Sequence, residues 1–515
     1  MADQADTIGL AAAGTQPELL RGLGLFDSTM IVVGSMIGSG IFITSSDMAH
    51  QLQSPGLLLV VWLVSGVMTL ICALSYGELA AAMPHVGGQY VYLREALGPI
   101  WGFLYGWTML LVIQTATIAA VGIAFAKFTA VLLPWFSASA WIWKVGTIGP
   151  WQLWFGSLGP YNVGLNRQNL LAIVSIVFLS WTNTRGLRLG KIIQNIFTVT
   201  KTGALACLVL LGFWFSTAVA RAANFTDFWR NASLSASHWY PPDQPTWMIG
   251  TISLVSVAMV GALFSMDAWN NITFTAAEVK NPSRNLPLSL SFGTGIVILL
   301  YTLANIAYLR VLPISGDPHG ATALARGIEF ATDGRVATAV AEVILGPAGA
   351  MVMAGAILIS AFGCNNGLIL SGARIYYAMA KDRLFFQSVG TVNRHHAPGR
   401  ALAVQCIWTA LLCLSGTYGQ LLDFLIFAAL LFYILTLVGL FLLRYRRPEM
   451  HRPYRTFGYP FLPALYLVLA VFIEFQLLRY KPQYTWPGLI IVLLGVPVYG
   501  IWKWAQRPGG DRRTV

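Results

Sequence analysis

The sequence predicts an all-α integral membrane protein with twelve transmembrane helices, in which two groups of five helices form an inverted repeat and two further helices follow. Three observations lead to this prediction. Of the 515 residues 56% are hydrophobic and only 10% are charged, whereas soluble domains carry about 25% charged residues. The apolar residues form long runs, and a helix needs roughly 20 of them to cross the bilayer core. Finally, the first and the sixth run are interrupted near their middle by glycine or by polar residues.

Twelve apolar runs are read as membrane spans. The eighth is longer than one span requires, and the ninth and tenth are separated only by a short turn at residues 415–419. In chain order, the runs lie at residues 25–48, 56–83, 100–133, 168–184, 192–215, 248–275, 287–312, 338–379, 401–415, 419–443, 458–479 and 485–504.

The Lys and Arg residues are divided unevenly between the two sides of the predicted membrane. An even number of spans places both termini on one side, and 21 of the 32 Lys and Arg residues fall in the tails and loops of that side. Nine fall on the opposite side, and two, Lys127 and Lys201, lie within spans. Because an excess of Lys and Arg marks the cytoplasmic side, we expect both termini to be cytoplasmic. The net charge of +12 therefore indicates topology and not binding to nucleic acid.

Several classes of protein are disfavoured by what the sequence lacks. The first twenty residues have no Lys or Arg and no long apolar run, so we expect no signal peptide. All five cysteines lie in apolar runs and all seven histidines lie in or beside loops, which predicts neither a disulfide framework nor a metal or haem site. No G-x-x-x-x-G-K-S/T and no H-E-x-x-H motif occurs, so neither an ATPase nor a metalloprotease is indicated. We therefore expect no cofactor, no metal and no enzymatic activity.

The two interrupted spans differ in what interrupts them. The first reads GSMIGSGIF over residues 34–42, with three glycines in seven residues. Glycine opposes the helix, so this segment is expected to leave helical geometry, although close helix packing is the alternative for an isolated Gly-x-x-x-Gly. The sixth carries Asp267, Asn270 and Asn271 at its middle. A carboxylate at that depth costs about 2.5–3.5 kcal/mol, so it must face a cavity, a partner or irregular backbone.

Each interrupted span opens a set of five helices. Because five is odd, the second set, residues 248–443, has the opposite orientation to the first, residues 25–215. Interrupted helices at corresponding positions of two halves are the best sequence indicator of a transporter's central site. The remaining segments are expected to be a cytoplasmic tail, an outer loop, two C-terminal helices and a second cytoplasmic tail, at residues 1–24, 216–247, 444–504 and 505–515.

Two broken helices also predict the kind of substrate. The N-terminus of a half-helix presents N–H groups and a partial positive charge, which suit a carboxylate. Unwound carbonyl groups present a partial negative charge, which suits an ammonium. An α-amino acid carries both groups on one carbon, so we expect an amino acid as the substrate.

Five ordered motifs resemble those of the amino acid–polyamine–organocation superfamily, in particular its L-type amino acid transporter branch and bacterial relatives. The resemblance covers about residues 20 to 470 and implies the LeuT-like form of the inverted repeat. The motifs are GSGIF at residues 38–42, SYGEL with GGQY at residues 75–90, FSMDAWN with EVKNP at residues 264–282, ARIYYAMAKD at residues 373–382, and PYRTFGYP at residues 453–460.

The resemblance also implies roles for individual residues. Ser39 and Gly40 would offer backbone N–H groups to the substrate carboxylate, and Met36 and Phe264 would offer backbone carbonyl groups to its ammonium. Phe264 would also cover the substrate as an aromatic gate. Lys201 lies where sodium-independent members often carry a lysine in the fifth span, and there it would tie the first and eighth spans together.

The polar residues within the spans leave alternatives open. Lys201 lies about nine residues into its span, roughly 13–14 Å by helical rise, so inward pairing is favoured over snorkelling, whereas Lys127 near an outer end is expected to snorkel. Burial disfavours a charged lysine, so Lys201 could also release and regain a proton. For Asp267, contact with substrate or a proton and capping of broken backbone are equally open. Asn365 and Asn366 either line a polar pocket or pair polar groups across the bundle.

The chain departs from the family pattern in three places. Asp267 stands where many L-type members have glycine, although relatives that accept cationic amino acids can have aspartate. Ala268 replaces the glycine that usually precedes the tryptophan, which is expected to narrow the pocket. The loop of residues 134–167 lacks the cysteine with which animal members bond their heavy subunit. We therefore expect no disulfide-linked partner and favour a bacterial inner membrane as the location.

Three hypotheses about function follow. The first is a secondary transporter, a sodium-independent exchanger of L-amino acids that works by alternating access, with neutral amino acids favoured over cationic ones. The second keeps the fold but couples uptake to a proton through Lys201 or Asp267. The third is a non-transporting membrane sensor or scaffold, which tails of only about 24 and 11 residues outside the spans disfavour.

Overall fold

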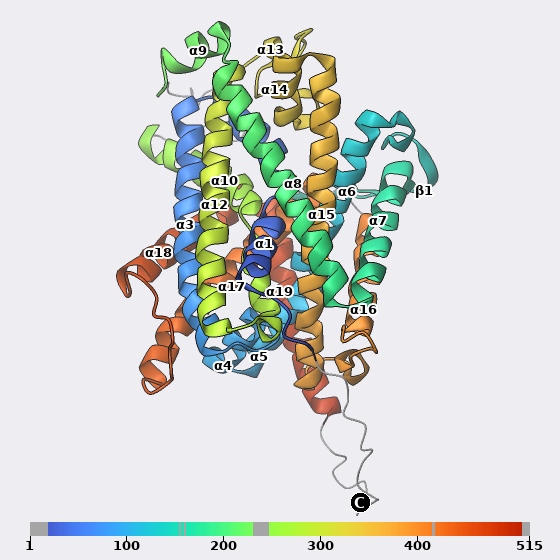
Figure 1. Cartoon of the computed structure of the whole chain (residues 1–515), viewed down its shortest axis with the longest axis vertical. Coiled ribbons are helices and arrows are strands. Elements are labelled where there is room, and N and C mark those ends of the chain that lie inside the picture. Colours follow the sequence, from blue (N-terminus) through green and yellow to red (C-terminus); the bar gives the residue numbers. More distant parts are fainter. Residues whose placement is uncertain (1–18, 154–155, 159–160, 230–246, 415–417, 507–515) are drawn as a thin grey trace, which may run out of the picture.

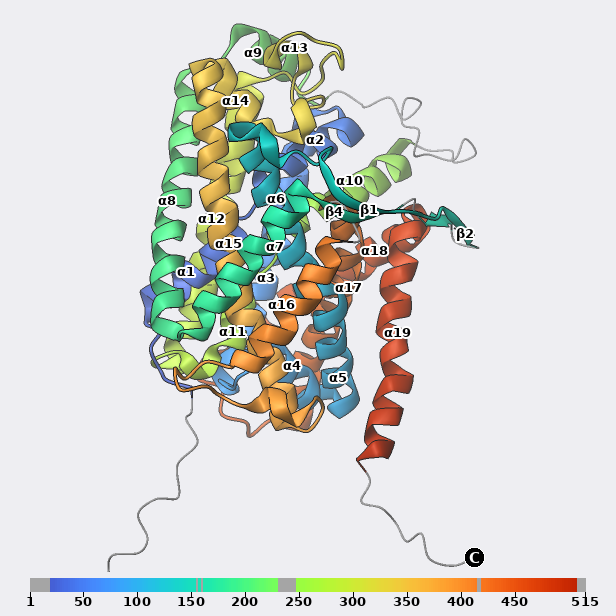
Figure 2. The same cartoon turned by 90° about the vertical axis from the view of Figure 1, so that its right-hand side faces the viewer.

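The computed structural model is a bundle of long helices, and the described chain starts and finishes at the same end of the bundle (Figures 1 and 2). It describes residues 19–153, 156–158, 161–229, 247–414 and 418–506. Within these residues, nine helical segments are long and apolar enough to cross a membrane, as judged by length and composition. The predicted fourth, sixth and ninth spans correspond to the helices α7, α10 and α16. The prediction of a multi-pass, mainly helical membrane protein is therefore confirmed.

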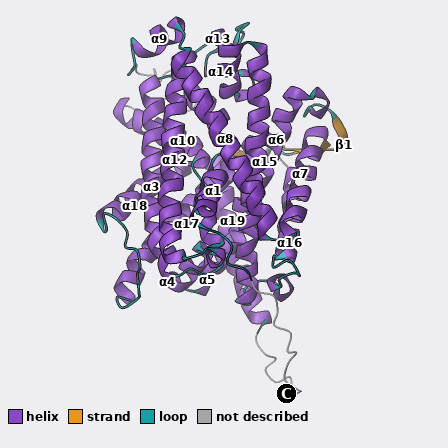
Figure 3. Ribbon diagram, in the orientation of Figure 1, coloured by secondary structure: helices purple, strands orange, loops and turns teal. Residues whose placement is uncertain are grey.

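The helices account for most of the described chain (Figure 3). A π-helical turn, Met109–Ile113, joins α5 to α6. In chain order the helices are α1 Leu25–Met36, α2 Gly40–Leu52, α3 Pro55–Ala82, α4 Gln89–Leu97, α5 Pro99–Thr108, α6 Gln114–Leu132, α7 Arg167–Thr184, α8 Leu187–Trp214, α9 Ala218–Phe225, α10 Trp247–Ser265, α11 Asn271–Phe274, α12 Pro282–Val311, α13 Ala323–Arg326, α14 Val336–Leu345, α15 Pro347–Lys381, α16 Gly399–Cys413, α17 Tyr418–Arg446, α18 Phe461–Tyr480 and α19 Pro482–Ala505.

The centre of the bundle is built around α1, which packs against α8, α12 and α15. Small residues let these helices approach closely, as is usual where lipid removes any hydrophobic drive between helices. A Cβ at Gly293 of α12 would lie 2.6 Å from Cβ of Val32 in α1. A Cβ at Gly363 of α15 would lie 2.5 Å from Cβ of Phe197 in α8. Neither position has room for a larger residue unless the helices separate.

Both predicted interruptions are present. The first span is broken at Ile37–Ser39 between α1 and α2, and the sixth is broken between α10 and α11. After the second break only the short α11 and one 3-10 turn, Ala276–Glu278, precede α12.

The eighth span was predicted wrongly as one helix over residues 338–379. The chain forms two helices there, α14 and α15, and only α15 is long enough to span. Gly346, at φ 70°, ends α14 and Pro347 starts α15. A positive φ suits glycine, and proline suits the first turn of a helix. The apolar run continues across this Gly-Pro pair, so hydropathy alone did not reveal the break.

The prediction of an entirely α-helical chain also fails in the loop between α6 and α7. There, β1 (Trp141–Ile148) pairs antiparallel with β4 (Tyr161–Asn166), and β2 (Trp151–Leu153) pairs with β3 (Gly156–Leu158). The segment is rich in aromatic and β-branched residues, which favour strands. It projects sideways toward α19 (Figure 2), and β3 lies against that helix.

Candidate functional site

The side chain of Lys201 lies in the gap between α1 and α2. It is only 1% exposed, and its Nζ donates hydrogen bonds to the carbonyl groups of Gly34 at 2.5 Å and Ile37 at 2.6 Å. A longer contact of 3.5 Å reaches the carbonyl of Ser360 in α15. The ammonium charge is thus stabilised by backbone dipoles at the first break. These contacts link the broken first span to α15 in the eighth span, the two spans that the resemblance expects this lysine to tie together. The part of Lys201 in transport stays a prediction.

The two breaks meet at the centre of the bundle. A Cβ at Gly40, the first residue of α2, would lie 2.4 Å from Oγ of Ser265 and 2.9 Å from its Cα at the end of α10. Only glycine fits so close to another backbone. One turn further, Oγ1 of Thr44 and Oγ of Ser265 are 3.0 Å apart and hydrogen-bonded. The sequence motif at residues 38–42 therefore has a packing reason as well as a conformational one.

Asp267 lies within the second break and pairs with α17. Its backbone N–H donates to the carbonyl of Phe264 at 3.1 Å, and its Oδ1 accepts a hydrogen bond from the hydroxyl of Tyr433 at 2.5 Å. The next residue, Ala268, has a φ of 66°, a left-handed conformation that strains any residue with a Cβ. Glycine, the residue that the resemblance implies at this position, would relieve the backbone strain at Ala268.

Replacing Ala268 by glycine is expected to stabilise the fold by about 1 kcal/mol, because it removes the left-handed strain of an L-residue. Thermal unfolding of the purified protein in detergent measures the effect. Ala262→Gly in the interior of α10 is the matched control, and it should lower stability by about 1 kcal/mol because glycine disfavours the helix. If both variants shift the unfolding midpoint in the same direction, the left-handed conformation at Ala268 does not destabilise the fold.

Two small cavities adjoin Asp267, and each measures about 20 Å³, room for roughly one water molecule. Two polar atoms at the first cavity, Nδ2 of Asn271 and the hydroxyl of Tyr105, are buried and have no hydrogen-bond partner among the described residues. The amide of Asn270 is instead bonded to Oε1 of Gln89 at 3.0 Å. Buried polar atoms are nearly always paired, so these two are available to a water molecule or to a polar atom of a ligand. The remaining polar lining of this cavity comes from Gln114, Thr117 and Tyr433.

The two carbonyl groups expected to bind a substrate ammonium already accept hydrogen bonds. The carbonyl of Met36 accepts one from the N–H of Gly38 at 2.8 Å and one from the hydroxyl of Tyr301 at 3.0 Å. The carbonyl of Phe264 accepts the N–H of Asp267. Sequence reasoning missed Tyr301, since nothing in its neighbourhood in α12 marks it as facing α1.

The N–H groups expected to bind the carboxylate lie at the start of a helix. Ser39 is the N-cap of α2 and Gly40 is its first residue. The first N–H groups of any helix lack partners within it. This helix start faces the end of α10, as the Gly40–Ser265 contact shows. The position fits a carboxylate, and the role stays a prediction.

Asn365 and Asn366 lie away from the central cavities. Oδ1 of Asn366 accepts a hydrogen bond from Nδ2 of Asn183 at 2.9 Å, and its own Nδ2 donates to Gly190 at 3.0 Å and to Gln194 at 3.2 Å. Asn365 is equally buried, and neither residue lines the cavities around Asp267. For Asn366 the geometry favours the pairing of polar groups between α7, α8 and α15, whereas Oδ1 of Asn365 is buried without a hydrogen-bond partner among the described residues.

Phe264 lines a third and much larger cavity, of about 480 Å³. It includes residues of the segment before α14, which lies at the end of the bundle opposite to the termini (Figure 1). We refer to it as the outer cavity. Lys127 lines it, and its Nζ donates to the carbonyl of Asp333 at 3.0 Å. The prediction that Lys127 snorkels stays a prediction; within the protein its ammonium reaches a carbonyl of the segment before α14.

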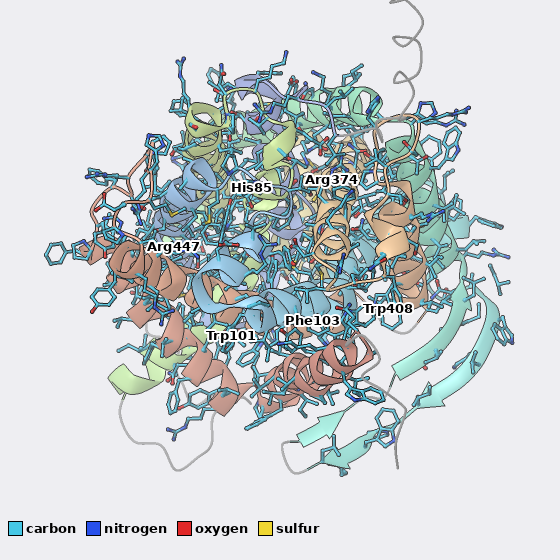
Figure 4. The ribbon with its side chains drawn as sticks, turned by 90° about the horizontal axis from the view of Figure 1, so that it is seen from below. His85, Trp101, Phe103, Arg374, Trp408 and Arg447 are labelled. Carbon is cyan, nitrogen blue, oxygen red and sulfur yellow. The ribbon has the colours of Figure 1, made fainter. Side chains whose placement is uncertain are left out.

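The end of the bundle that carries the termini is closed by buried ion pairs. Arg374 of α15 and Glu278 form a bidentate pair at 2.8 and 3.1 Å, with side chains 2% and 0% exposed. The backbone carbonyl of Glu278 also accepts the N–H groups of Gly22 and Leu23 at 2.9 and 3.0 Å, which holds the start of the chain against the second break. Figure 4 views this end, with Arg374 among the helices.

A second pair ties the end of α3 to the end of α17 and to the segment after it. Glu78 accepts hydrogen bonds from Arg444 at 2.9 and 2.5 Å and from the N–H of Thr456 at 2.7 Å. Glu78, Glu278 and Arg374 all lie in the motifs quoted from the sequence. Their pairing was not predicted, because each motif was read alone.

A multi-pass bundle whose two broken helices meet at a closed polar centre, with a cavity at one end, has the architecture of a secondary transporter. The chain belongs to the amino acid permease family, whose model matches residues 23–499, and so to the superfamily and L-type branch that its motifs predicted. Members of this family transport amino acids and are not enzymes.

Three relatives illustrate the similarity. The chain is 28% identical to the large neutral amino acids transporter small subunit 2 of Rattus norvegicus, over 97% of this chain and 84% of that protein. It is 28% identical to the b(0,+)-type amino acid transporter 1 of Homo sapiens, over 95% and 90%. It is also 28% identical to the Asc-type amino acid transporter 1 of Mus musculus, over 96% and 84%.

Proposed function

We propose that this protein is a sodium-independent exchanger of L-amino acids, with neutral amino acids favoured, that works by alternating access. The observation that carries the proposal is that the ammonium of Lys201 donates hydrogen bonds to the carbonyl groups of Gly34 and Ile37. A cation supplied by the protein already stabilises the broken backbone, so no sodium ion is needed there. The relatives named for large neutral amino acids support the substrate class.

In the proposed complex the N–H groups at Ser39 and Gly40 bind the substrate carboxylate, and the carbonyl groups of Met36 and Phe264 bind its ammonium. Because both carbonyl groups already accept hydrogen bonds, the ammonium would share or replace those donors. The ring of Phe264 would act as the gate between the outer cavity and the centre. The unpaired amide of Asn271 would then bind a polar atom of the substrate.

The proposed topology has twelve spans, the nine segments together with α7, α10 and α16, as a five-plus-five inverted repeat with two added helices. The excess of Lys and Arg supports cytoplasmic termini. The outer cavity would then face outward and the Glu278–Arg374 pair would close the cytoplasmic side. Transport would require this cytoplasmic closure to alternate with a closure of the outer cavity. The pair of Asp27 in α1 and Lys191 in α8, which are 3.0 Å apart, would be among the contacts that change.

We further propose that the chain works without a disulfide-linked subunit in a bacterial inner membrane. Several relatives are named as a small subunit, but the loop of residues 134–167 has no cysteine. Reducing and non-reducing electrophoresis of the protein purified from its native membrane is the measurement. A band that shifts on reduction would exclude this part of the proposal.

Counterflow in proteoliposomes tests exchange. Vesicles preloaded with L-leucine are expected to take up labelled L-leucine many times faster than empty vesicles, without added sodium. Equal uptake by empty vesicles would exclude obligate exchange.

The second candidate, proton-coupled uptake, rests on the two titratable groups Lys201 and Asp267 within the bundle. An inward proton gradient that drives accumulation into empty vesicles would favour it, and no saturable flux of any of the twenty amino acids would leave only a non-transporting role.

Asp267→Asn tests the part of the carboxylate in substrate charge. We expect inhibition of L-leucine uptake by L-arginine to weaken about tenfold, since a favourable charge pair of about 1.4 kcal/mol is lost. Neutral amino acids should change by less than about threefold. The control is Tyr433→Phe, which removes the hydroxyl bonded to Asp267 but keeps the negative charge. If L-arginine and neutral amino acids lose affinity equally, Asp267 only supports the break.

A further inference from the structure

The outer cavity is the only one of the three cavities described above that could hold an amino acid in this conformation. Its volume is about 480 Å³, within the range of roughly 300–1,000 Å³ that is typical of ligand sites. The two cavities at Asp267 measure about 20 Å³ each. A substrate arriving from the outer side would therefore be held first above Phe264, and the lining of the outer cavity determines what it can hold.

Part of that lining is apolar. Val257, Val260 and Phe264 of α10 and Ile43 of α2 all line the outer cavity. These residues offer contact to an aliphatic side chain without any polar group that would need a partner. The outer cavity is thus suited to an apolar side chain on this part of its surface.

The charged part of the lining contains two acids that already have partners. Glu329 pairs with Nδ1 of His50 at 3.3 Å and accepts from Nε2 of Gln53 at 3.1 Å. The carboxylate of Asp333 pairs with Arg335 at 2.6 Å. These contacts stabilise the wall of the outer cavity, and they already compensate the charge of each carboxylate in part.

Two opposite charges of the lining remain uncompensated by contacts. Asp47 of α2 makes no hydrogen bond, and no ion pair within 4 Å, to any residue of the described chain. Lys127 has its ammonium bonded to a backbone carbonyl, and none of the described carboxylates lies within 4 Å of it. The two side chains lie close enough to interact electrostatically. Asp47 and Lys127 thus offer one negative and one positive charge to the same cavity, and a further cation of the lining, Lys481, also acts electrostatically on Asp47.

We propose that the outer cavity is a binding site for a zwitterionic amino acid with an apolar side chain, with its ammonium at Asp47 and its carboxylate at Lys127, occupied before Phe264 moves. The proposal rests on the proposed function, because it assigns a first stop to the same substrate. A zwitterion matches the two free charges, and the α10 surface matches its side chain. Neither charge alone would distinguish an amino acid from a simple ion.

Uptake of labelled L-leucine from the outer side of oriented proteoliposomes tests the site. Asp47→Asn and Lys127→Gln should each raise the outer KM about threefold to tenfold, the effect of losing a solvent-accessible charge pair. The maximal rate and the KM from the opposite side should stay within about twofold, because the central site is unchanged. Asp317→Asn is the matched control, since it removes an acid from the loop before α13 that does not line the outer cavity. Outer KM values within twofold of wild type for both cavity variants would overturn the proposal.

Equilibrium binding of labelled L-leucine to the purified full-length protein separates this site from the proposed function. If no amino acid is transported, the proposed function fails, but the binding measurement still decides on the outer cavity. Binding that is about threefold to tenfold weaker in Asp47→Asn and in Lys127→Gln supports the site. Equal binding by wild type and both variants, or no binding by wild type, overturns it.

Discussion

Lys201→Ala is expected to lower L-amino-acid transport at least about 100-fold. The side chain supplies both short hydrogen bonds to the carbonyl groups of Gly34 and Ile37 at the first break. The carbonyl of Gly34 would lose its partner, at a cost of about 1–3 kcal/mol, while that of Ile37 would keep only the hydroxyl of Ser360 at 3.2 Å; a loss of about 2.7 kcal/mol is already a factor of about 100. The break would then rearrange or admit water, and the central site would lose its shape. Initial rates of L-leucine counterflow in proteoliposomes measure the effect.

Two controls separate this effect from a loss of folding. Thr200→Ala changes the adjacent residue, whose hydroxyl bonds only to Ile196 of its own helix at 2.9 Å, and it should transport like wild type. A monodisperse elution profile and a measurable unfolding midpoint for Lys201→Ala show that the bundle is still formed. If Lys201→Ala keeps wild-type transport with the same response to pH, Lys201 has neither a coupling nor a conformational role.

Glu278→Gln is expected to have the largest effect on stability, a loss of about 3–5 kcal/mol, because it leaves the guanidinium of Arg374 buried without a counter-charge. The carbonyl of Glu278 also holds the N–H groups of Gly22 and Leu23. Loosening this residue should therefore release the start of the chain as well. Chemical or thermal unfolding measures the stability, and hydrogen exchange at the Gly22 and Leu23 amides should accelerate in the same variant.

The matched control is an exposed pair on the same side of the bundle. Arg447 pairs with Glu95 at 3.1 Å, but its side chain is 53% exposed. Arg447→Gln should therefore change stability by no more than about 1 kcal/mol. The double variant Glu278→Gln with Arg374→Gln should lose less than the sum of the two single variants, because no charge is then left alone. A Glu278→Gln protein as stable as Arg447→Gln would show that the buried pair contributes little.

The sequence predicted most of the helices within a few residues, and it located both breaks. The apolar runs were sufficient because a lipid-exposed helix must be apolar and must satisfy its own backbone. The same reasoning failed at Gly346-Pro347, where the run stays apolar although the helix stops. It also failed at β1–β4, because a strand in an outer loop lies outside the rule that selects spans.

The candidate site was predicted less completely. Lys201 was expected to pair inward and does so, but its acceptors at Gly34 and Ile37 lie more than 160 positions away in sequence. The partner of Asp267, Tyr433, is 166 positions away. Lys127 was expected to snorkel near an outer end of its span, and its place in the lining of the outer cavity was not predicted. Each of these contacts joins helices that are far apart along the chain.

The sequence by itself determined the class of protein, most of the helices, the two breaks and the family, since these depend on local composition and on short motifs. Only the tertiary structure decided which polar groups meet, such as Glu278 with Arg374 and Asp267 with Tyr433. The physical reason is that lipid is as apolar as the helix surfaces, so hydropathy does not say which faces pack together. Close packing at small residues and the need of buried charges for partners select those faces. Both become visible only when the helices are assembled.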